Sequence, residues 1–479
     1  MVRLRFFILS LAVVLAASVT SGCSRDDGFS TDSRQMLSFP SDVISLDSVI
    51  SGMKSPSVMF MVYNNNDRAI RFDAFLAGGS GSVFEMMADG IGGNAACGLE
   101  VGANDSVVFV MRTNTRYRDD GPSTVYSDTI RFILGNGAVQ HLPVRVTSVN
   151  ARMLKSYRVQ GIEMLDSAMP YLILDSLYVP FGTTLKIAPG TRLYFYSGAG
   201  IAVDGRIAAE GSRDSRIIFS GHRLDCATSE LPFDLLDGQW KGIRLGRDSY
   251  GNRFEWCDIH GAENGIVADS SDIGKVKADI VSSVIHNMTR NCIEAKGCKV
   301  SIANSQITNS GECCLNVTGG ETSVMFSTIA DFSVWHRARV AVSIIDRLSE
   351  TDERPFGGAS FDGCIITGRH PDEIEVSAGL KSDWENRLRI SHSLVMTRDS
   401  LSGFFSDCRF EKQKTGLVYG AGNFVASPVR YDCSFRLDSI SGARGIGGNA
   451  SLCPTDLDGN ARPEENPDAG CYQYVPLNP

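Results

Sequence analysis

The chain has 479 residues, of which 43% are hydrophobic and 21% are charged, and its formal net charge is −9. These values are typical of a soluble globular chain with room for two or three domains and a sizeable core. An acidic chain is poorly suited to general nucleic-acid binding, because phosphate contacts call for a basic surface. We therefore expect no nucleic-acid partner.

The N-terminal residues have the pattern of an export signal. Arg3 and Arg5 form a basic region, and the apolar stretch over 6–17 is too short for a settled membrane span. It ends in "VTSGC", which is similar to the lipobox of bacterial lipoproteins, although Thr20 stands where such proteins usually have an aliphatic residue. The resemblance implies that Cys23 is acylated and becomes the mature N-terminus. An ordinary secretory signal with a chance cysteine is the alternative.

Acyl chains on Cys23 would attach the protein to a membrane without a transmembrane helix. The sequence "SRDD" after it is similar to the Ser-plus-acidic signal that sends lipoproteins of the Bacteroidota to the outer face of the outer membrane. This resemblance implies an outer membrane lipoprotein exposed on the cell surface, and a flexible acidic linker is the alternative. We assign residues 1–22 to a lipoprotein signal peptide and residues 23–34 to a lipidated linker.

Twelve of the thirteen cysteines follow Cys23. An even number in an exported chain suggests disulfides. Disulfide frameworks, however, belong mostly to short domains that cannot build a core, whereas this chain can build one. We therefore expect some of these cysteines to be buried as small hydrophobic residues.

Residues 35–150 are expected to form strands. Four stretches in this region are short, partly alternating, and rich in β-branched and aromatic residues. They lie at 57–64, 105–113, 128–137 and 141–149. Between the last two, Asn136-Gly137 predicts a type I′ hairpin turn. Short strands separated by polar turns over this length indicate an immunoglobulin-like (Ig-like) β-sandwich.

A repeated pattern begins near residue 256. Five stretches align with one another: "WCDIHG" (256–261), "SSVIHN" (282–287), "NSQITN" (304–309), "FSTIAD" (326–331) and "GCIITG" (363–368). Their aligned isoleucines, spaced by 26, 22, 22 and 37 residues, are Ile259, Ile285, Ile307, Ile329 and Ile366. A period in the low twenties is typical of a solenoid, whose rungs bury a core only against their neighbours.

The aligned columns indicate which side chains face the core. Two residues before each isoleucine stands a small residue, and two residues after it stands a Gly, Asn or Asp that tolerates a left-handed turn. The small residues are Cys257, Ser283, Ser305, Ser327 and Cys364, and the turn residues are Gly261, Asn287, Asn309, Asp331 and Gly368. This period of two predicts parallel strands whose isoleucines form one internal stack. Cys292 and Cys314, also 22 residues apart, are expected to stack in the same way.

The pattern resembles the right-handed parallel β-helix. The run 170–211, with "IAPGT" near its centre, is similar to the first rungs of many secreted β-helix proteins. The stretch "DGQWKGIRLG" (237–246) is similar to a rung start that those proteins share. The end, "DLDGNARPEENPDAGCYQY" (456–474), is similar to their closing segment, with departures among its last residues.

We therefore expect an all-β protein with an Ig-like β-sandwich over 35–150 and a right-handed parallel β-helix over 157–474. Together with the lipobox, the whole chain resembles a family of Bacteroidota surface lipoproteins of unknown function. The resemblance is specific for fold and carries no activity with it.

Two histidines fall at the same outward column of neighbouring rungs. With Asp258 beside them, His260 and His286 could share a proton or bind a transition metal. Zinc normally takes three or four protein ligands, and the next outward residues in the column, Thr308 and Ala330, supply none. We therefore expect the two histidines to be solvated surface side chains. We expect no metal site, no cofactor and no catalytic residue.

Three tryptophans, Trp256, Trp335 and Trp384, could offer stacking faces to sugars. Packing beneath an inserted loop is the alternative for each of them. The inserted loops at 334–339 and 349–358 carry charge. The stretch "DLDGN" (456–460) lacks the acidic positions of a calcium-binding loop, and it is predicted to be a turn.

Seven Asp-Ser/Thr-apolar triplets are similar to the O-glycosylation acceptor pattern of the Bacteroidota. Some of these matches are expected by chance, because Asp and Ser are common turn residues. The acceptors would be Ser48, Ser106, Thr129, Ser167, Ser176, Ser400 and Ser439.

The function we expect is that of a non-catalytic, lipid-anchored cell-surface protein. Its β-helix would contact a polysaccharide or another surface protein, because solenoids present extended surfaces. The alternative is a polysaccharide lyase or glycoside hydrolase on the same scaffold. Such an enzyme would need paired carboxylates, or acids beside a basic residue, on one outward face. No column of the repeat supplies that set.

Overall fold

The computed structural model describes residues 28–118, 121–228, 231–333, 336, 339–346, 356–382, 384–385, 387–411, 420–425 and 434–476. The chain separates into two compact units, one formed by Met1–Arg116 and Val125–Ser148 and the other by Tyr117–Thr124 and Val149–Pro479. The proposed signal peptide and Cys23 lie outside the described residues. Within those residues, no helix is long and apolar enough to cross a membrane.

The first unit is a sandwich of two sheets. One sheet has the order β1 (Ile44–Ile50), β9 (Val139–Val149), β8 (Ser123–Leu134), β3 (Ile70–Leu76), β6 (Ala95–Val101). The other has the order β2 (Val58–Asn64), β7 (Asp105–Thr113), β4 (Phe84–Ala88), β5 (Ile91–Gly93). An apolar core lies in this unit, and within it Phe72, Phe109 and Phe132 are in mutual ring contact. The Ig-like β-sandwich predicted from the alternating strands is confirmed.

The hairpin between β8 and β9 is present, but its turn is not of the predicted type I′. That turn needs a positive φ at both central residues, and of Asn136 and Gly137 only the glycine, at 86°, has one. The Asn136 side chain is tied elsewhere, because its amide donates hydrogen bonds to the carbonyls of Asp32 and Gln35. The turn therefore closes on a single left-handed glycine.

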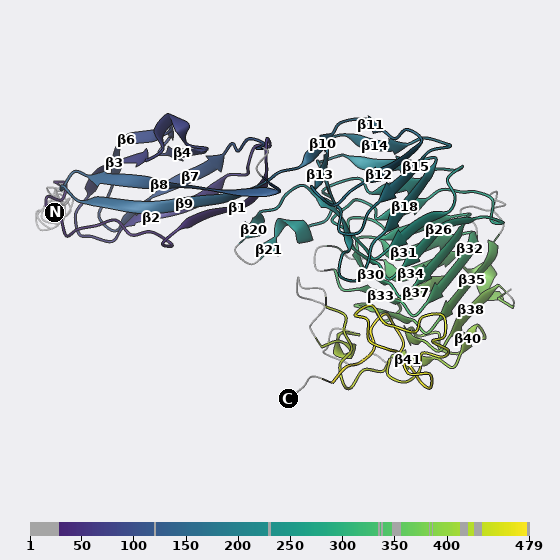
Figure 1. Ribbon diagram of the computed structural model, residues 1–479. Helices are drawn as coiled ribbons and strands as arrows, with labels where there is room; N and C mark the ends of the chain where they lie inside the picture. The colour runs from purple at the N-terminus through teal and green to yellow at the C-terminus, as the bar shows by residue number, and fades with distance from the viewer. Residues whose placement is uncertain are drawn as a thin grey trace, which may run out of the picture. The chain divides into compact units, whose positions relative to one another are not determined.

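The second unit is a right-handed parallel β-helix, as predicted, whose strands fall into three sheets, named here sheets I, II and III (Figure 1). Sheet I has the order β10 (Arg152–Leu154), β13 (Tyr171–Ile173), β16 (Arg192–Phe195), β19 (Ile217–Gly221), β24 (Cys257–His260), β27 (Val284–Met288), β30 (Gln306–Ser310), β33 (Thr328–Asp331), β36 (Ile365–Gly368), β39 (Leu394–Met396), β41 (Arg409–Glu411).

Sheet II has the order β11 (Tyr157–Arg158), β14 (Ser176–Val179), β17 (Gly200–Val203), β22 (Ile243–Leu245), β25 (Ile266–Ala268), β28 (Ile293–Lys296), β31 (Cys313–Thr318), β34 (Val340–Ile345), β37 (Ile374–Val376). Sheet III has the order β12 (Ile162–Leu165), β15 (Thr184–Ile187), β18 (Arg206–Glu210), β23 (Asn252–Glu255), β26 (Val276–Val281), β29 (Lys299–Ala303), β32 (Gly320–Met325), β35 (Phe356–Asp362), β38 (Leu388–Ser391), β40 (Phe405–Ser406).

A few short elements lie outside these sheets. They are η1 (Gly79–Gly81), β20 (Cys226–Thr228), β21 (Leu231–Pro232), η2 (Phe233–Leu235), α2 (Ala378–Ser382) and η3 (Ala421–Asn423). The segment with β20, β21 and η2 is inserted between β19 of sheet I and β22 of sheet II, and it becomes important for the site described below.

The isoleucines of the repeat form one continuous column inside the solenoid. Register pairs join Ile259, Ile285, Ile307, Ile329 and Ile366 in that order along sheet I. All five side chains are fully buried. Because parallel strands stack equivalent positions on one another, each isoleucine contacts its counterparts in the adjacent rungs and together they supply one wall of the apolar core.

The small-residue column satisfies backbone hydrogen bonds at the corner where the chain enters sheet I. The hydroxyl of Ser305 accepts the N–H of Ser283 at 3.1 Å and donates to the carbonyl of Ala303 at 2.8 Å. Ser327 accepts the N–H of Ser305 in the same way, at 3.1 Å. In the rungs that have a serine here, the hydroxyl is therefore fully buried without leaving a polar group unsatisfied.

Left-handed residues occur at both ends of the sheet I strands. The predicted turn column holds a positive φ at Gly261, Asn287 and Asn309, but not at Asp331 or Gly368. A second column, at the preceding corner, also has a positive φ, and its members are Trp256, Ser282, Asn304, Phe326, Gly363 and His392. In each rung, a single left-handed residue at this corner lets the chain turn from sheet III into sheet I within about one residue.

Most cysteines of the β-helix unit are buried as small apolar side chains. The buried ones among the described residues are Cys257, Cys292, Cys298, Cys313, Cys314, Cys364, Cys453 and Cys471. Cys292 and Cys314 precede the register partners Ile293 and Leu315 in adjacent rungs, so they occupy equivalent positions. Burial raises the pKa of the Cys257 thiol well above its usual range. The Cys257 thiol therefore stays protonated and unreactive.

The C-terminal segment does not continue the solenoid. In the described part of the chain, the last strand of the β-helix ends at Glu411. The sequence pattern predicts that the β-helix extends to residue 474. Residues 434–474 instead pack on the outer side of sheet I. The Tyr472 hydroxyl donates to Gln306 Oε1 at 3.1 Å, and the Cys471 N–H donates to Thr328 Oγ1 at 3.1 Å. A separate apolar cluster fills this contact.

Candidate functional site

His260 on β24 and His286 on β27 are register partners on the outer side of sheet I, as the repeat predicts. The expectation that they are solvated is wrong, because their exposed fractions are 5% and 8%. Their rings stack with centroids 4.9 Å apart. The inserted segment with η2 covers this part of the sheet, and the Asn287 amide donates to the Leu235 carbonyl of η2 at 2.9 Å.

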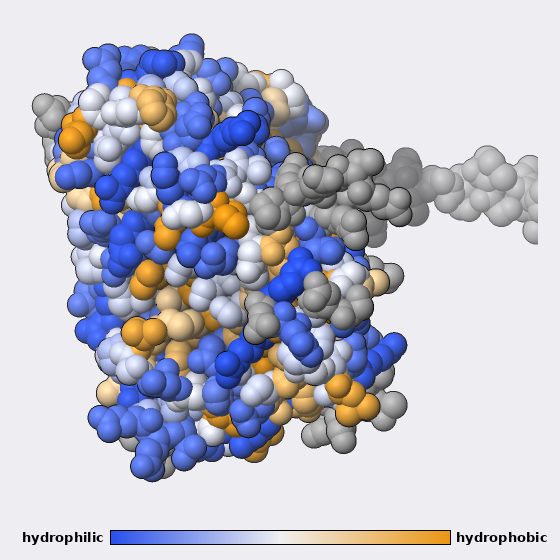
Figure 2. All heavy atoms as spheres, turned by 90° about the vertical axis from the view of Figure 1, so that its right-hand side faces the viewer, coloured by the Kyte–Doolittle hydropathy of each residue, from blue (hydrophilic) through white to orange (hydrophobic). Residues whose placement is uncertain are grey.

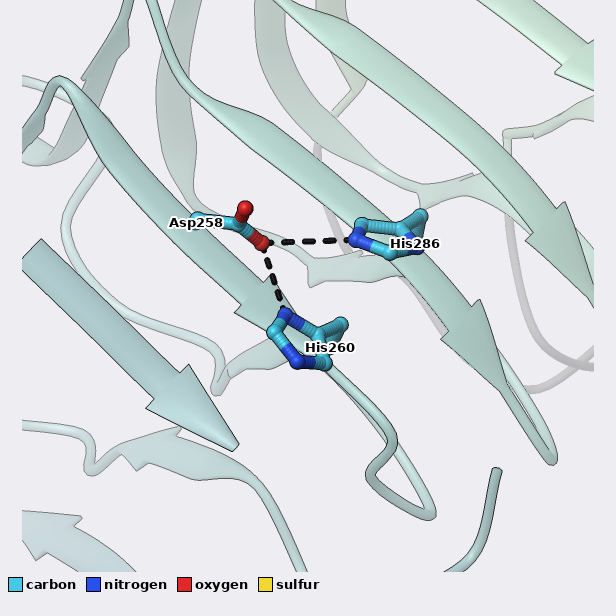
Figure 3. Close-up of side chains that lie close together, drawn as sticks. All are labelled: Asp258, His260 and His286. Carbon is cyan, nitrogen blue, oxygen red and sulfur yellow. Dashed lines mark hydrogen bonds and ion pairs between the residues drawn. The ribbon is translucent and has the colours of Figure 1, made fainter. Parts of the chain in front are cut away.

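Asp258, two residues before His260 on the same strand, points to both rings (Figure 3). Its Oδ1 atom lies 2.7 Å from His260 Nδ1 and 3.3 Å from His286 Nε2. The two histidines therefore converge on one carboxylate oxygen. The sequence pattern places all three residues on one face, since alternate residues of a strand point the same way.

Asp234 on η2 completes the cluster from outside the sheet. Its Oδ1 atom lies 3.0 Å from His260 Nε2, so both nitrogens of that ring have a carboxylate partner. Sequence reasoning missed Asp234, because it lies in a non-repetitive insertion and has no column to mark it.

The carboxylates set the charge of the cluster. Burial by itself would lower the pKa of His260, but the charge of Asp258 and the hydrogen bonds to Asp234 and Asp258 outweigh it and raise the pKa to about 10. Burial would likewise raise the pKa of Asp258, but the charges and hydrogen bonds of His260 and His286 hold it well below its usual range. The pair is therefore ionised at neutral pH in the absence of other ligands.

A second candidate site is a groove on the outer side of sheet III. Its volume is about 490 Å³, and strands β32, β35, β38 and β40 contribute to its lining. Those strands lie on the right in Figure 1, and Figure 2 looks onto that side. The surface there is mostly hydrophilic, interrupted by less hydrophilic residues in its lower half. Small residues such as Ser323, Gly358 and Ser360 make the groove shallow-walled and leave backbone accessible.

Charged and aromatic side chains border the groove. Trp384 is half-buried and packs so closely on Gly403 that a Cβ there would lie 2.5 Å from Trp384 Cζ2. Arg387 and Arg389 contribute two positive charges. Arg389 is exposed. The one acidic residue in the lining of this groove, Glu321, is already paired with Lys299 at 2.7 Å.

Trp256 does not offer a comparable face. Trp256 is half-buried in the cluster beneath the C-terminal segment, and the Arg216 guanidinium lies 5.5 Å from its ring centroid. Trp335 lies outside the described residues, as does most of the charged loop at 349–358. The stretch 456–460 forms a turn in which Asp456 accepts the N–H groups of Asp458 and Asn460, in agreement with the sequence prediction.

The candidate O-glycosylation acceptors differ in exposure. Ser167, Ser176 and Ser439 are exposed, and the other four are half-buried, namely Ser48, Ser106, Thr129 and Ser400. Their modification remains a prediction from the sequence pattern. Arg389, in contrast, was not singled out in the sequence, although its outward position in the alternating run "LRIS" was a usable signal.

Comparison with known proteins adds little about function. No protein-family model matches the chain. A stretch of 93 residues is 34% identical to Protein bark beetle of Drosophila melanogaster, covering 18% of this chain and 3% of that protein. The ASH/PapD-like domain of human CEP192 is similar in structure with 10% identity and a TM-score of 0.20, covering 28% of this chain and 96% of that one. Dex49A from Penicillium minioluteum has 11% identity and a TM-score of 0.18, covering 75% of this chain and 74% of that one. Scores this low carry no functional argument.

Proposed function

We propose that this protein is a non-catalytic surface module whose β-helix binds an acidic polysaccharide in the groove of sheet III. The observation that carries the proposal is the combination of Trp384 with Arg387 and Arg389 along one open groove. An aromatic ring provides a flat apolar face for a sugar ring, and a guanidinium binds a carboxylate in a bidentate manner.

The charge balance of the groove favours a uronic acid over a neutral sugar. Glu321 is neutralised by Lys299, so the exposed Arg389 leaves a local positive charge in the groove. The net charge of −9 on the whole chain opposes a polyanion at long range. Salt screens that repulsion beyond about 8–10 Å, whereas contacts within the groove are shorter than this distance.

Binding of polygalacturonate or alginate fragments to the purified protein tests the proposal. Trp384→Ala should weaken binding at least about tenfold, because a tryptophan at the centre of a contact is typically worth more than about 1.4 kcal/mol. Arg389→Gln should weaken it and reduce its dependence on salt. Arg145→Gln, an exposed arginine on β9, is the matched control and should bind as the wild type does. If the Trp384 and Arg389 variants both bound the polysaccharide as tightly as the wild type does, this groove would not be the binding site.

The alternative function is a polysaccharide lyase or glycoside hydrolase that uses the same groove. Acid–base chemistry would need a second carboxylate beside Glu321 or a positioned base, and the residues that line the groove contain neither. Product release in a turnover assay with the same polysaccharides would favour the enzyme. Binding without product favours the non-catalytic module.

The lipid anchor is part of the same proposal. Support for it comes from the "VTSGC" signal in the sequence, and Cys23 itself lies outside the described residues. The expected mature N-terminus is a diacylated or triacylated Cys23, which mass spectrometry of the native protein would detect. Cys23→Ala should release the protein from membranes. A mature N-terminus at another residue would show that the signal is an ordinary secretory one.

A further inference from the structure

The Asp258, His260 and His286 cluster brings together the ligand types that zinc prefers. One ligand atom from each residue, a carboxylate oxygen or an imidazole nitrogen, lies within 4.8 Å of the other two. Both histidine side chains are at least nine-tenths buried, so their rings are held in place by packing. We propose that these three residues bind a divalent transition metal ion, zinc by preference, through Asp258 Oδ1, His260 Nδ1 and His286 Nε2.

The two separations between the carboxylate and the histidines are close to those of a tetrahedral centre. Ligand atoms at about 2.0–2.2 Å from a tetrahedral zinc ion are about 3.3 Å from one another. The separation of Asp258 Oδ1 from His286 Nε2 is already 3.3 Å. The separation from His260 Nδ1 is 2.7 Å and would have to widen by about half an ångström, which a small rotation of the carboxylate provides.

Asp234 supplies a carboxylate partner of the kind that metal-binding histidines usually have. A ligand histidine usually donates its second N–H to a carboxylate, which fixes the tautomer and the ring orientation. Asp234 Oδ1 lies 3.0 Å from His260 Nε2, so Nε2 keeps its proton, and the proton on Nδ1 is released to solvent when the metal ion binds that nitrogen. The Gln239 amide holds η2 in position through hydrogen bonds to the carbonyls of Phe233 and Leu236 at 2.9 and 2.7 Å. Asp234 is therefore a positioning residue.

The outward column of the repeat supplies only two of the ligands, His260 and His286. Asp258 belongs to the same strand face as His260 and supplies the third ligand that the column lacks. Three protein ligands leave one position for a water molecule or for an oxygen atom of a bound molecule. The Asp258 side chain is 29% exposed, so solvent reaches the cluster on the side of this carboxylate.

Metal binding to the purified, chelator-treated protein tests the proposal. Titration with zinc in a calorimeter should give one ion per chain with a dissociation constant below micromolar. Titration with cobalt should give the intense visible absorption of a tetrahedral ion with nitrogen and oxygen ligands, and zinc should displace it. Failure of the wild-type protein to bind either ion, or binding without that absorption, would overturn the proposal.

Variants identify the ligands. Asp258→Asn and His286→Gln should each weaken zinc binding at least about 100-fold, whereas His141→Gln, an exposed histidine of the sandwich, should leave it unchanged. Asp234→Asn should weaken it about 10–100-fold without removing the cobalt absorption. Because Asp234 is 43% exposed, this variant should fold even where a ligand variant does not, which circular dichroism would check. Unchanged affinity in a folded ligand variant would leave the cluster as an ion pair that only stabilises sheet I. Unchanged affinity in the Asp234 variant would contradict the positioning role of Asp234.

Discussion

Replacing Ile307 with aspartate should unfold the β-helix or lower its free energy of unfolding by several kcal/mol. The side chain is fully buried between Ile285 and Ile329, and it belongs to the continuous apolar core of the solenoid. A carboxylate at this position would have no cation or donor within the isoleucine column, and an unpaired buried charge is among the costliest single changes. The effect should also spread to neighbouring rungs, because each rung is stabilised mainly by the two beside it.

Tryptophan fluorescence during urea unfolding would measure this effect. All four tryptophans of the chain follow residue 149, so the signal reports on the β-helix unit alone. Ile307→Val should cost only about 1 kcal/mol, because it removes one methylene group. Ala202→Asp is the charge-matched control, since Ala202 is exposed on β17 beside Arg244 and should change stability by less than about 0.5 kcal/mol. An unchanged midpoint in the Ile307→Asp variant would mean that Ile307 does not face the core.

The stability of the β-helix should fall as the pH rises from about 4.5 to 8 because of Glu373. Burial, with help from the nearby charge of Asp331, raises the pKa of the Glu373 carboxyl to about 8. Between these pH values the folded state keeps a proton that the unfolded state has lost. The unfolded state then binds fewer protons, so stability decreases by about 1.4 kcal/mol for each pH unit. The contribution is fully present below about pH 4.5 and is lost above about pH 8.

Glu373→Gln should make the unfolding free energy less dependent on pH. The slope should decrease by about 1.4 kcal/mol for each pH unit, which corresponds to one proton. The glutamine is neutral throughout and keeps an acceptor for one of the two backbone N–H groups, those of His370 and Ala341, that bind the carboxyl at 2.6 and 2.9 Å. The comparison is between the slopes of unfolding free energy against pH, measured from pH 5 to 8. Glu312→Gln, at a partly exposed ion pair with Arg290, is the control and should keep the wild-type slope. Identical slopes in the wild type and the Glu373 variant would mean that another group causes the pH dependence. The buried Asp331, whose pKa is also raised, would be the first residue to examine.

The repeat made much of the β-helix predictable, because its information is local. Ile307 and Ser305 differ by two residues in a strand, and their counterparts recur every rung, so the sequence alone assigns both to the inside. The fold class follows from the same columns. The type of the Asn136-Gly137 turn was not predictable in this way, because the Asn136 side chain binds carbonyls more than a hundred residues away in sequence.

The candidate sites depended on contacts that no periodicity encodes. Alternation predicts that His260 and His286 point away from the core, and it is correct about direction. Whether an outward side chain meets solvent depends on what packs against it, and here the inserted η2 segment covers the pair. The groove of sheet III likewise needs Trp384, which follows α2 in an insertion, to come beside Arg389 on β38.

The sequence by itself determined which side chains form the core of the β-helix, since similar rungs stack on one another and repeat one pattern of small residue and isoleucine. Only the tertiary structure decided the outside. Tyr472 reaches Gln306 from 166 residues away, and Asp234 reaches His260 from a loop without any repeat. The physical reason is that core packing in a solenoid is a contact between neighbours in sequence order, whereas the cover of an outer face is a long-range contact formed once.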